Sequence, residues 1–139
     1  MKQILKENIL KNILIVVILI LIYFPIHTYT ENSSFNKDNT AIGNVIIAVS
    51  LFSVCACFGN FGFTYEKINP KNRFQRIIAH TTTGLLMLVL GITLMFTAEL
   101  IFLTIGYFIL IHVIVFLLYI ACIGYDFWDL YRLEEEHKK

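Results

Sequence analysis

The longest apolar stretch of the chain runs from Ile77 to Ile123, and within these 47 residues Glu99 is the only Asp, Glu, Lys or Arg. A bilayer core about 30 Å thick is crossed by a helix of roughly 20 apolar residues. The stretch is therefore too long for one crossing and sufficient for two. The pattern predicts transmembrane helices at about 76–97 and 100–123, with Glu99 in a tight turn between them.

Two further apolar stretches precede this pair. The first, about 9–26, is apolar on all sides, which suits a helix that faces lipid; no cleavage pattern follows it, so we expect it to be retained. The polar segment 27–39 is expected to be a solvated loop. The second stretch, about 41–63, completes a predicted single domain, an all-α, four-transmembrane-helix bundle, with a helical tail at 124–139.

The basic residues are distributed unequally among the polar segments. Ten of the eleven Lys and Arg residues lie in the N-terminal segment, the 65–76 loop and the tail, and only Lys37 lies on the other side. The positive-inside rule therefore predicts that both termini are cytoplasmic, in the inner membrane of a bacterium. Residues expected to set this orientation or face lipid headgroups are Lys67, Lys71, Arg73 and Arg76, and the expected interface anchors are Trp128 and Tyr131.

Composition supports the membrane class, because 58% of the residues are hydrophobic and only 15% are charged, against about 25% charged in soluble domains. The three cysteines Cys55, Cys57 and Cys122 all fall in predicted spans. Their odd number and two-residue spacing suit neither a disulfide framework nor a zinc site. We expect them to act as small hydrophobic side chains.

A stripe of small and polar side chains marks the second predicted span. Its members recur at spacings of three, four or seven residues and therefore share one helical face: Gly43, Ser50, Ser53, Cys57 and Asn60. Such residues collect where membrane helices pack closely. Packing is the simpler interpretation, and the alternative is that the stripe lines a water-filled path in an oligomer.

Two histidines lie inside predicted spans. His80 precedes three threonines, including Thr83, so this segment is either a flexible turn with His80 reaching the interface or a gate that changes charge near neutral pH. His112 lies in mid-span, where an ionisable group is a functional candidate, although a neutral histidine bonded to a neighbouring helix would be purely structural. A depth difference of roughly 9 Å argues against haem between them, and we expect no cofactor and no metal.

Glu99 is expected to face water at the outer end of the hairpin. The alternative is a ring of glutamates at the outer pore mouth of an oligomer, which would favour cations. The sequence contains no nucleophile with a partnered base, no paired carboxylates within a span and no phosphate-binding glycine loop. We therefore do not expect an enzyme.

The architecture resembles the RexB-type membrane proteins of phage exclusion systems, with four spans, a basic loop after the second and a charged tail. Glu99 and His112 are similarly placed, although the turn after Glu99 is much tighter here. The resemblance implies a membrane effector or ion channel that depolarises an infected cell.

The resulting hypothesis is a small homo-oligomeric channel or membrane-perturbing effector, with a role in antiphage defence. A cytoplasmic protein would bind through the 65–76 loop and the tail, and nucleic acid is not an expected partner. The alternative is a non-conducting partner, either an immunity protein against a pore-forming toxin or an accessory subunit. A small dimeric exporter that depends on Glu99 is a third hypothesis.

Overall fold

The computed structural model describes residues 2–32, 40–58, 67 and 69–139. Its regular secondary structure is wholly α-helical in this part of the chain and contains no strand, which confirms the all-α prediction there. The helices are α1 (Lys2–Asn32), α2 (Thr40–Phe58), α4 (Arg73–Ile105) and α5 (Phe108–Lys138).

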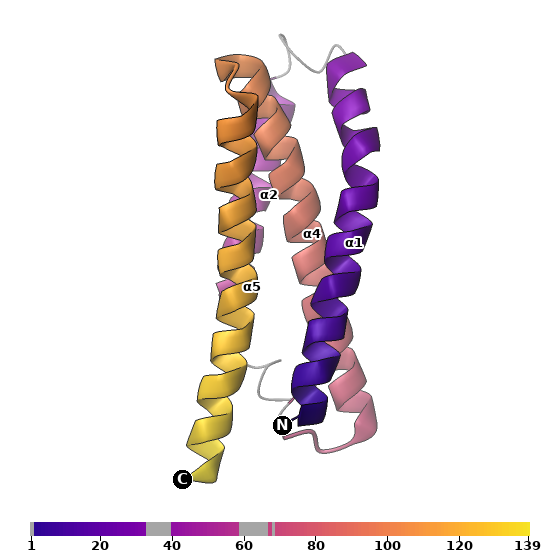
Figure 1. The fold of residues 1–139 in the computed structure, drawn as a ribbon, viewed down its shortest axis with the longest axis vertical. Coiled ribbons are helices and arrows are strands. Elements are labelled where there is room, and N and C mark those ends of the chain that lie inside the picture. Colours follow the sequence, from indigo (N-terminus) through magenta and orange to yellow (C-terminus); the bar gives the residue numbers. More distant parts are fainter. Residues whose placement is uncertain (1, 33–39, 59–66, 68) are drawn as a thin grey trace.

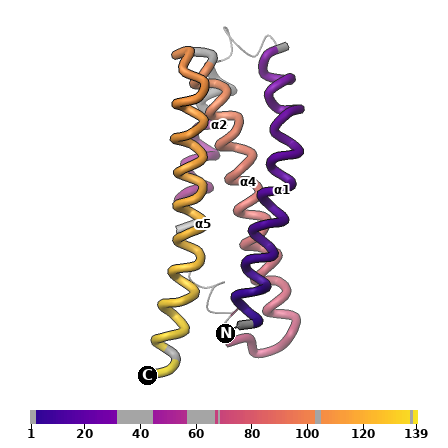
Figure 2. Tube along the Cα trace, viewed as in Figure 1, coloured from indigo at the N-terminus to yellow at the C-terminus, as the bar shows by residue number. Residues whose placement is uncertain are grey.

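The helices lie lengthwise beside one another, and both chain termini are at the same end of the bundle (Figure 1). α4 is the central element, because α1, α2 and α5 all pack against it, while α2 also packs against α5. The tube in Figure 2 shows α1 and α5 on the two sides of α4. We refer to the end with both termini as the terminal end, and to the other as the distal end.

Three segments are long and apolar enough to cross a membrane: Gln3–Glu31, Arg73–Phe102 and Phe108–Glu136. α2 contributes a shorter apolar segment among the described residues, Val45–Ala56. The length and composition of these helices indicate a helical membrane protein.

The turn between α4 and α5 lies at Gly106 and Tyr107, so the prediction that Glu99 occupies this turn was wrong. Gly106 adopts the left-handed conformation, with φ of 84°, and its N–H donates to the carbonyl of Phe102 at 2.7 Å. Glycine is the residue that ends a helix this way without steric cost. A lone charge in an apolar stretch suggested a turn, but Glu99 lies within α4, where neighbouring helices provide its polar partners.

α1 also extends further than the predicted span 9–26. Residues 27–32, expected in a loop, continue the helix beyond Pro25. Proline removes one backbone hydrogen bond from a helix interior, and contacts with α4 must stabilise the helix beyond it. The polar side chains of this last turn supply such contacts, as described below.

The centre of the bundle is an apolar core. It comprises seven buried side chains from three helices: Ile15, Leu19, Met87, Leu90, Leu94, Tyr119 and Cys122. The Tyr119 hydroxyl donates to the carbonyl of Met87 at 3.2 Å, which satisfies the one phenol in this core. A helix–helix contact of this kind in lipid depends on close packing rather than on the hydrophobic effect.

Gly91 lets α1 approach α4 closely. A Cβ atom at this position would overlap Leu19 Cδ1 and lie 3.2 Å from Leu19 Cγ. At Gly84, on the same helix, the nearest atom to an added Cβ is Lys11 Cγ or Cδ at 3.6 Å, an ordinary contact.

The two glycines give a matched test of this packing. We expect Gly91→Ala to be less stable than Gly84→Ala by about 1–3 kcal/mol, the usual cost of overpacking a core. Thermal unfolding of both variants in detergent measures the difference. Equal stability of the two variants would show that α1 does not depend on close approach at Gly91.

Candidate functional site

The distal part of the bundle contains a buried carboxylate that is contacted from two other helices. Glu99 of α4 is fully buried. His112 Nε2 and the Tyr23 hydroxyl lie 3.0 and 3.3 Å from Oε1, and His27 Nδ1 and the Thr30 hydroxyl lie 3.0 and 3.3 Å from Oε2. We call these five residues the Glu99 network.

Helical spacing brings the α1 members of the network together. Tyr23, His27 and Thr30 are separated by four and three residues, so they share the face of α1 that packs against α4. His112 lies one turn inside α5, and its Nδ1 is 2.8 Å from the carbonyl of Phe108. The carboxylate therefore links α1, α4 and α5 near the distal end.

The contacts of His112 determine how many protons its pair with Glu99 holds. The Phe108 carbonyl can only accept a hydrogen bond, so Nδ1 must carry a proton and donate to it. Nε2 faces a carboxylate oxygen at 3.0 Å. Either Nε2 is also protonated, giving an imidazolium beside a carboxylate, or Glu99 carries the proton. Both arrangements contain one proton more than a neutral histidine and an ionised glutamate.

His27 lies between two carboxylates. Its Nδ1 is 3.0 Å from Glu99 Oε2, and its Nε2 is 3.3 Å from Oε1 of Glu31, one turn further along α1. Both ring nitrogens can donate only when the imidazole is doubly protonated. Both contacts of His27 are therefore hydrogen bonds only when its ring carries two protons.

Aromatic rings surround the two imidazoles. The Tyr23 ring stacks on His27 at 5.9 Å between centroids, and the Phe108 ring lies 4.1 Å from that of His112. The face of an aromatic ring attracts a cation. These rings would stabilise either imidazole when it is protonated.

A chain of titratable groups connects the network to the surface. The Glu31 side chain is 55% exposed, whereas His27 is a quarter exposed and Glu99 is fully buried. The contacts run from Glu31 to His27, then to Glu99 and His112, and none exceeds 3.3 Å. This arrangement links the exposed Glu31 to the buried Glu99 and to His112 through side chains that can exchange protons.

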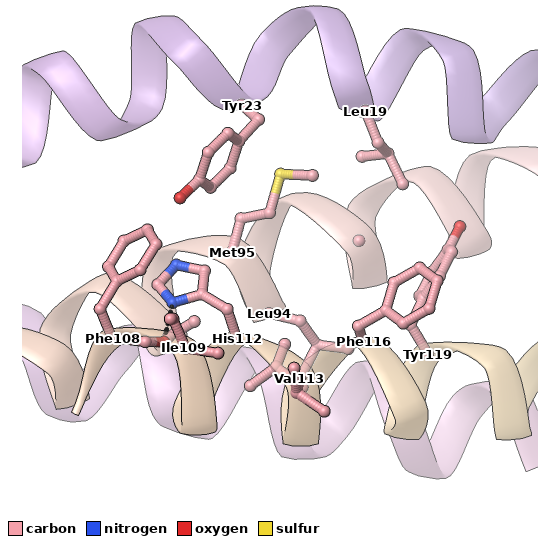
Figure 3. A pocket seen from close by; sticks show the side chains of 13 residues that line it. Leu19, Tyr23, Leu94, Met95, Phe108, Ile109, His112, Val113, Phe116 and Tyr119 are labelled. Carbon is pink, nitrogen blue, oxygen red and sulfur yellow. Dashed lines mark hydrogen bonds between the residues drawn. The ribbon is translucent and has the colours of Figure 1, made fainter.

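An apolar groove lies beside the network, between α1, α4 and α5. Its volume is about 420 Å³. Figure 3 shows His112 and Tyr23 at one part of the groove and Leu19 and Tyr119 at another, with Met95 between them. The network thus borders a hydrocarbon-lined space rather than a polar channel.

A second polar cluster lies toward the terminal end. Asp126 of α5 accepts a hydrogen bond from Asn8 at 2.8 Å and forms ion pairs with Lys11 at 3.4 Å and Lys67 at 3.5 Å. Lys11 also donates to Thr83 at 3.2 Å. We call these five residues the Asp126 cluster. Burial lowers the pKa of Lys67 to about 8, although the Asp126 carboxylate opposes this shift.

Lys67 does not have the predicted contact with lipid headgroups. Its side chain is fully buried because Asp126 attracts it into the bundle. Lys71 and Arg73 are exposed as expected, whereas Arg76 lies 3.6 Å from Glu7 of α1. Contact with lipid headgroups stays a prediction for Lys71, Arg73 and Arg76.

His80, the predicted gate residue, and His112, the predicted mid-span histidine, lie in different parts of the structure. Thr83 belongs to the Asp126 cluster through its hydrogen bond with Lys11, and His80, which lies 3.1 Å from Glu7, is one turn away from Thr83 on α4. His112 lies in the Glu99 network. The interface candidates Trp128 and Tyr131 are both exposed, and the Arg132 guanidinium lies 5.4 Å from the centre of the Trp128 ring.

Two members of the polar stripe on α2 are buried. The Ser50 hydroxyl bonds to that of Thr97 on α4 at 2.9 Å, and Ser53 donates to the carbonyl of Val49. The contact between Ser50 and Thr97 favours helix packing over pore lining at Ser50, whereas the Ser53 hydrogen bond stays within α2. Gly43 and Cys57 are described only as part of the α2 backbone, and Asn60 lies outside the described residues.

The position of Glu99 also conflicts with the expectation that it faces water at an outer mouth. A ring of glutamates needs carboxylates that point away from each protomer, whereas this side chain points into the bundle. Within the described part of the chain, no three His, Cys, Asp or Glu residues are arranged to hold a metal ion.

Several residues of these sites escaped the sequence analysis. Tyr23, His27 and Thr30 form a polar stripe at helical spacing that continues past Pro25, and this spacing was the available signal. Asn8 and Lys11 form a similar pair at the start of the chain. Both stripes lie at the ends of an apolar segment, where polar residues ordinarily face water.

Together, the fold and these two sites define a helical membrane protein with a buried acid–histidine network. No protein-family model, curated protein or solved structure matches the chain.

Asp126 provides a test of the second cluster. We expect Asp126→Asn to lower the free energy of unfolding by about 3–5 kcal/mol, because removing one partner of a buried ion pair leaves the other charge unpaired. Denaturant unfolding in detergent measures the change, and Glu136→Gln, an exposed carboxylate in the same helix, is the control. A loss equal to that of the control would mean that the buried lysines do not need Asp126.

Proposed function

We propose that the protein is a proton-controlled effector of the bacterial cytoplasmic membrane. It forms a bundle of four spans with both termini in the cytoplasm, which places the distal end on the outer side. The observation that carries the proposal is the fully buried Glu99, with an imidazole on each carboxylate oxygen.

The cost of burying these groups supports a functional role. Ionisable residues within a membrane are rare and mark functional sites by default. A buried ionic network can often be replaced by apolar residues without loss of stability. Leu19, Leu90 and Leu94 already form an apolar contact between α1 and α4, so α1 does not need a charged network merely to pack.

The direction of the proton response follows from the hydrogen bonds. The contacts of His27 are complete when its ring carries two protons, and those of His112 are complete when it and Glu99 together hold one extra proton. Histidine is the side chain that ordinarily loses its proton between about pH 5 and 8. Stability gained by a protonated histidine is present at low pH and is lost as the pH rises. Loss of the proton that His27 places between Glu99 and Glu31 removes one donor from these contacts, so we expect deprotonation to weaken the attachment of the distal part of α1 to α4.

Release of α1 would be the output of the proposed switch. Three of the four groups around Glu99 belong to α1, so weakening the network separates this helix from α4 and α5 at the distal end. The apolar groove beside the network would then open to lipid or to another membrane protein.

Spin-label distances test the switch. Labels carried by non-natural residues at Phe24 and Ile109, both exposed near the network, should give a narrow distance distribution at about pH 5 and a broader one at about pH 7.5. Glu99→Gln removes the ionisable carboxylate and should make the two distributions alike. Glu136→Gln is the matched carboxylate control and should keep the pH response. A wild-type distribution that does not change with pH would contradict the proposal.

The middle of the bundle favours an effector that does not conduct ions as a single protomer. The apolar core, including Leu19, Met87 and Leu90, separates the Glu99 network from the Asp126 cluster. The outward faces of the long helices carry mainly Leu, Ile, Val and Phe, which line a water-filled pore poorly. Both observations favour a protein that does not conduct ions, which is what an immunity protein or an accessory subunit requires.

An oligomeric ion channel is the second candidate. The Glu99 network favours it, because intramembrane ionisable chains also mark ion pathways, and the resemblance to phage-exclusion membrane proteins points the same way.

Flux measurements distinguish the two candidates. Purified protein in liposomes that contain a pH- and potassium-sensitive dye should give no ion flux above empty liposomes at about pH 5 or about pH 7.5. Flux that depends on Glu99 would overturn the non-conducting proposal and establish the channel.

A further inference from the structure

We propose that a groove between α1 and α4 at the terminal end binds the headgroup and the first part of an acyl chain of an anionic phospholipid. This terminal groove has a volume of about 410 Å³ and is lined by residues between Glu7 and Leu14 of α1 and between Arg73 and Thr81 of α4. It is separate from the Glu99 network and does not depend on the proposed proton switch.

Cationic groups dominate the polar part of the terminal groove. Lys11, Arg73 and Arg76 line it, whereas Glu7 is the one carboxylate among the lining residues. Glu7 is shared between Arg76 at 3.6 Å and His80 at 3.1 Å. Lys11 and Arg73 therefore have no carboxylate partner among the residues that line the groove. The guanidinium groups of Arg73 and Arg76 are well suited to phosphate oxygens.

The buried charges behind the groove increase this positive potential. Lys11 also belongs to the Asp126 cluster, where it shares one carboxylate with Lys67. Lys67 is fully buried, so water screens its charge poorly. An anion in the groove would balance the excess positive charge of two lysines around a single aspartate.

The order of polar and apolar groups along the groove favours a phospholipid over a free anion. Arg73 is the first residue of α4, and Ile77 lies one turn further into the helix. On α1, Leu10 and Leu14 continue the apolar part. All three apolar side chains are largely exposed: Leu10 by 66%, Leu14 by 59% and Ile77 by 52%. A phospholipid whose phosphate lies at the arginines would thus place its acyl chain against these apolar side chains. A soluble anion would leave them uncovered.

Native mass spectrometry of the full-length protein from a neutral detergent tests the proposal. Phosphatidylglycerol and phosphatidylcholine with identical acyl chains are titrated separately, and sodium phosphate is a third titrant. We expect phosphatidylglycerol to bind most tightly. A basic residue near the membrane surface contributes about fivefold to the affinity for an anionic lipid.

The variants separate the groove from a general effect of charge. Arg73→Gln should weaken phosphatidylglycerol binding about fivefold, and adding Arg76→Gln should bring the loss to about 25-fold. Arg73 is exposed at the helix end, so its single variant tests the site without disturbing the Glu7 contacts. Lys138→Gln with Lys139→Gln removes the same charge from the exposed tail and should leave binding unchanged.

Three results would overturn the proposal. Equal binding of the two lipids would show that charge is not recognised. Binding of sodium phosphate as strong as that of phosphatidylglycerol would identify a site for free anions. An equal loss in the tail variant would show that net charge, rather than the groove, determines binding.

Discussion

The structure depends above all on how the charge of Glu99 is accommodated inside an apolar bundle. An unpaired carboxylate in hydrocarbon would be too costly to persist, and several hydrogen bonds are needed to offset the loss of water. Four groups contact the two oxygens, three from α1 and one from α5. Satisfying one side chain thereby sets the rotation of two helices about their axes and their register against α4.

Apolar contacts could not specify this arrangement by themselves. Lipid tails are as apolar as leucine, so helices in a bilayer gain little from the hydrophobic effect when they associate. The core supplies dispersion contacts and the close approach at Gly91, whereas the polar groups supply direction. The Glu99 network and the Asp126 cluster lie toward opposite ends of α1, and between them they fix its position along α4.

The sequence predicts the helical class well and the polar sites poorly, for one physical reason. Runs of Ile, Leu and Val reveal long helices directly, so the apolar segments of α1, α4 and α5 were recognisable. A charged side chain inside such a run can be accommodated in two ways. Either the chain turns so that the side chain reaches water, or a neighbouring helix provides a polar partner. Glu99 takes the second, and nothing local to residue 99 distinguishes them.

The same ambiguity explains the other misplaced residues. His27 and Thr30 follow Pro25 and a run of polar residues, a local pattern typical of a loop, yet they face Glu99, which is about 70 positions away in sequence. Lys67 belongs to a basic segment that reads as a loop in the sequence, yet it pairs with Asp126 in the last helix. The better signal at Gly106 was available in the sequence, because glycine ends helices, but the charge at Glu99 outweighed it.

α1 provides a physical connection between the two polar ends of the bundle. Lys11 and His27 are 16 residues apart, about 24 Å along a helix, and the Leu19 contact with Gly91 lies midway between them. If the whole of α1 moves as one rigid helix when its distal part leaves Glu99, rotation about this contact must also move Lys11 relative to Asp126. If the helix instead bends at Pro25, where one backbone hydrogen bond is missing, the motion stays local. The state of the Lys11–Asp126 ion pair therefore distinguishes the two motions, because only the rigid-body motion disturbs this ion pair.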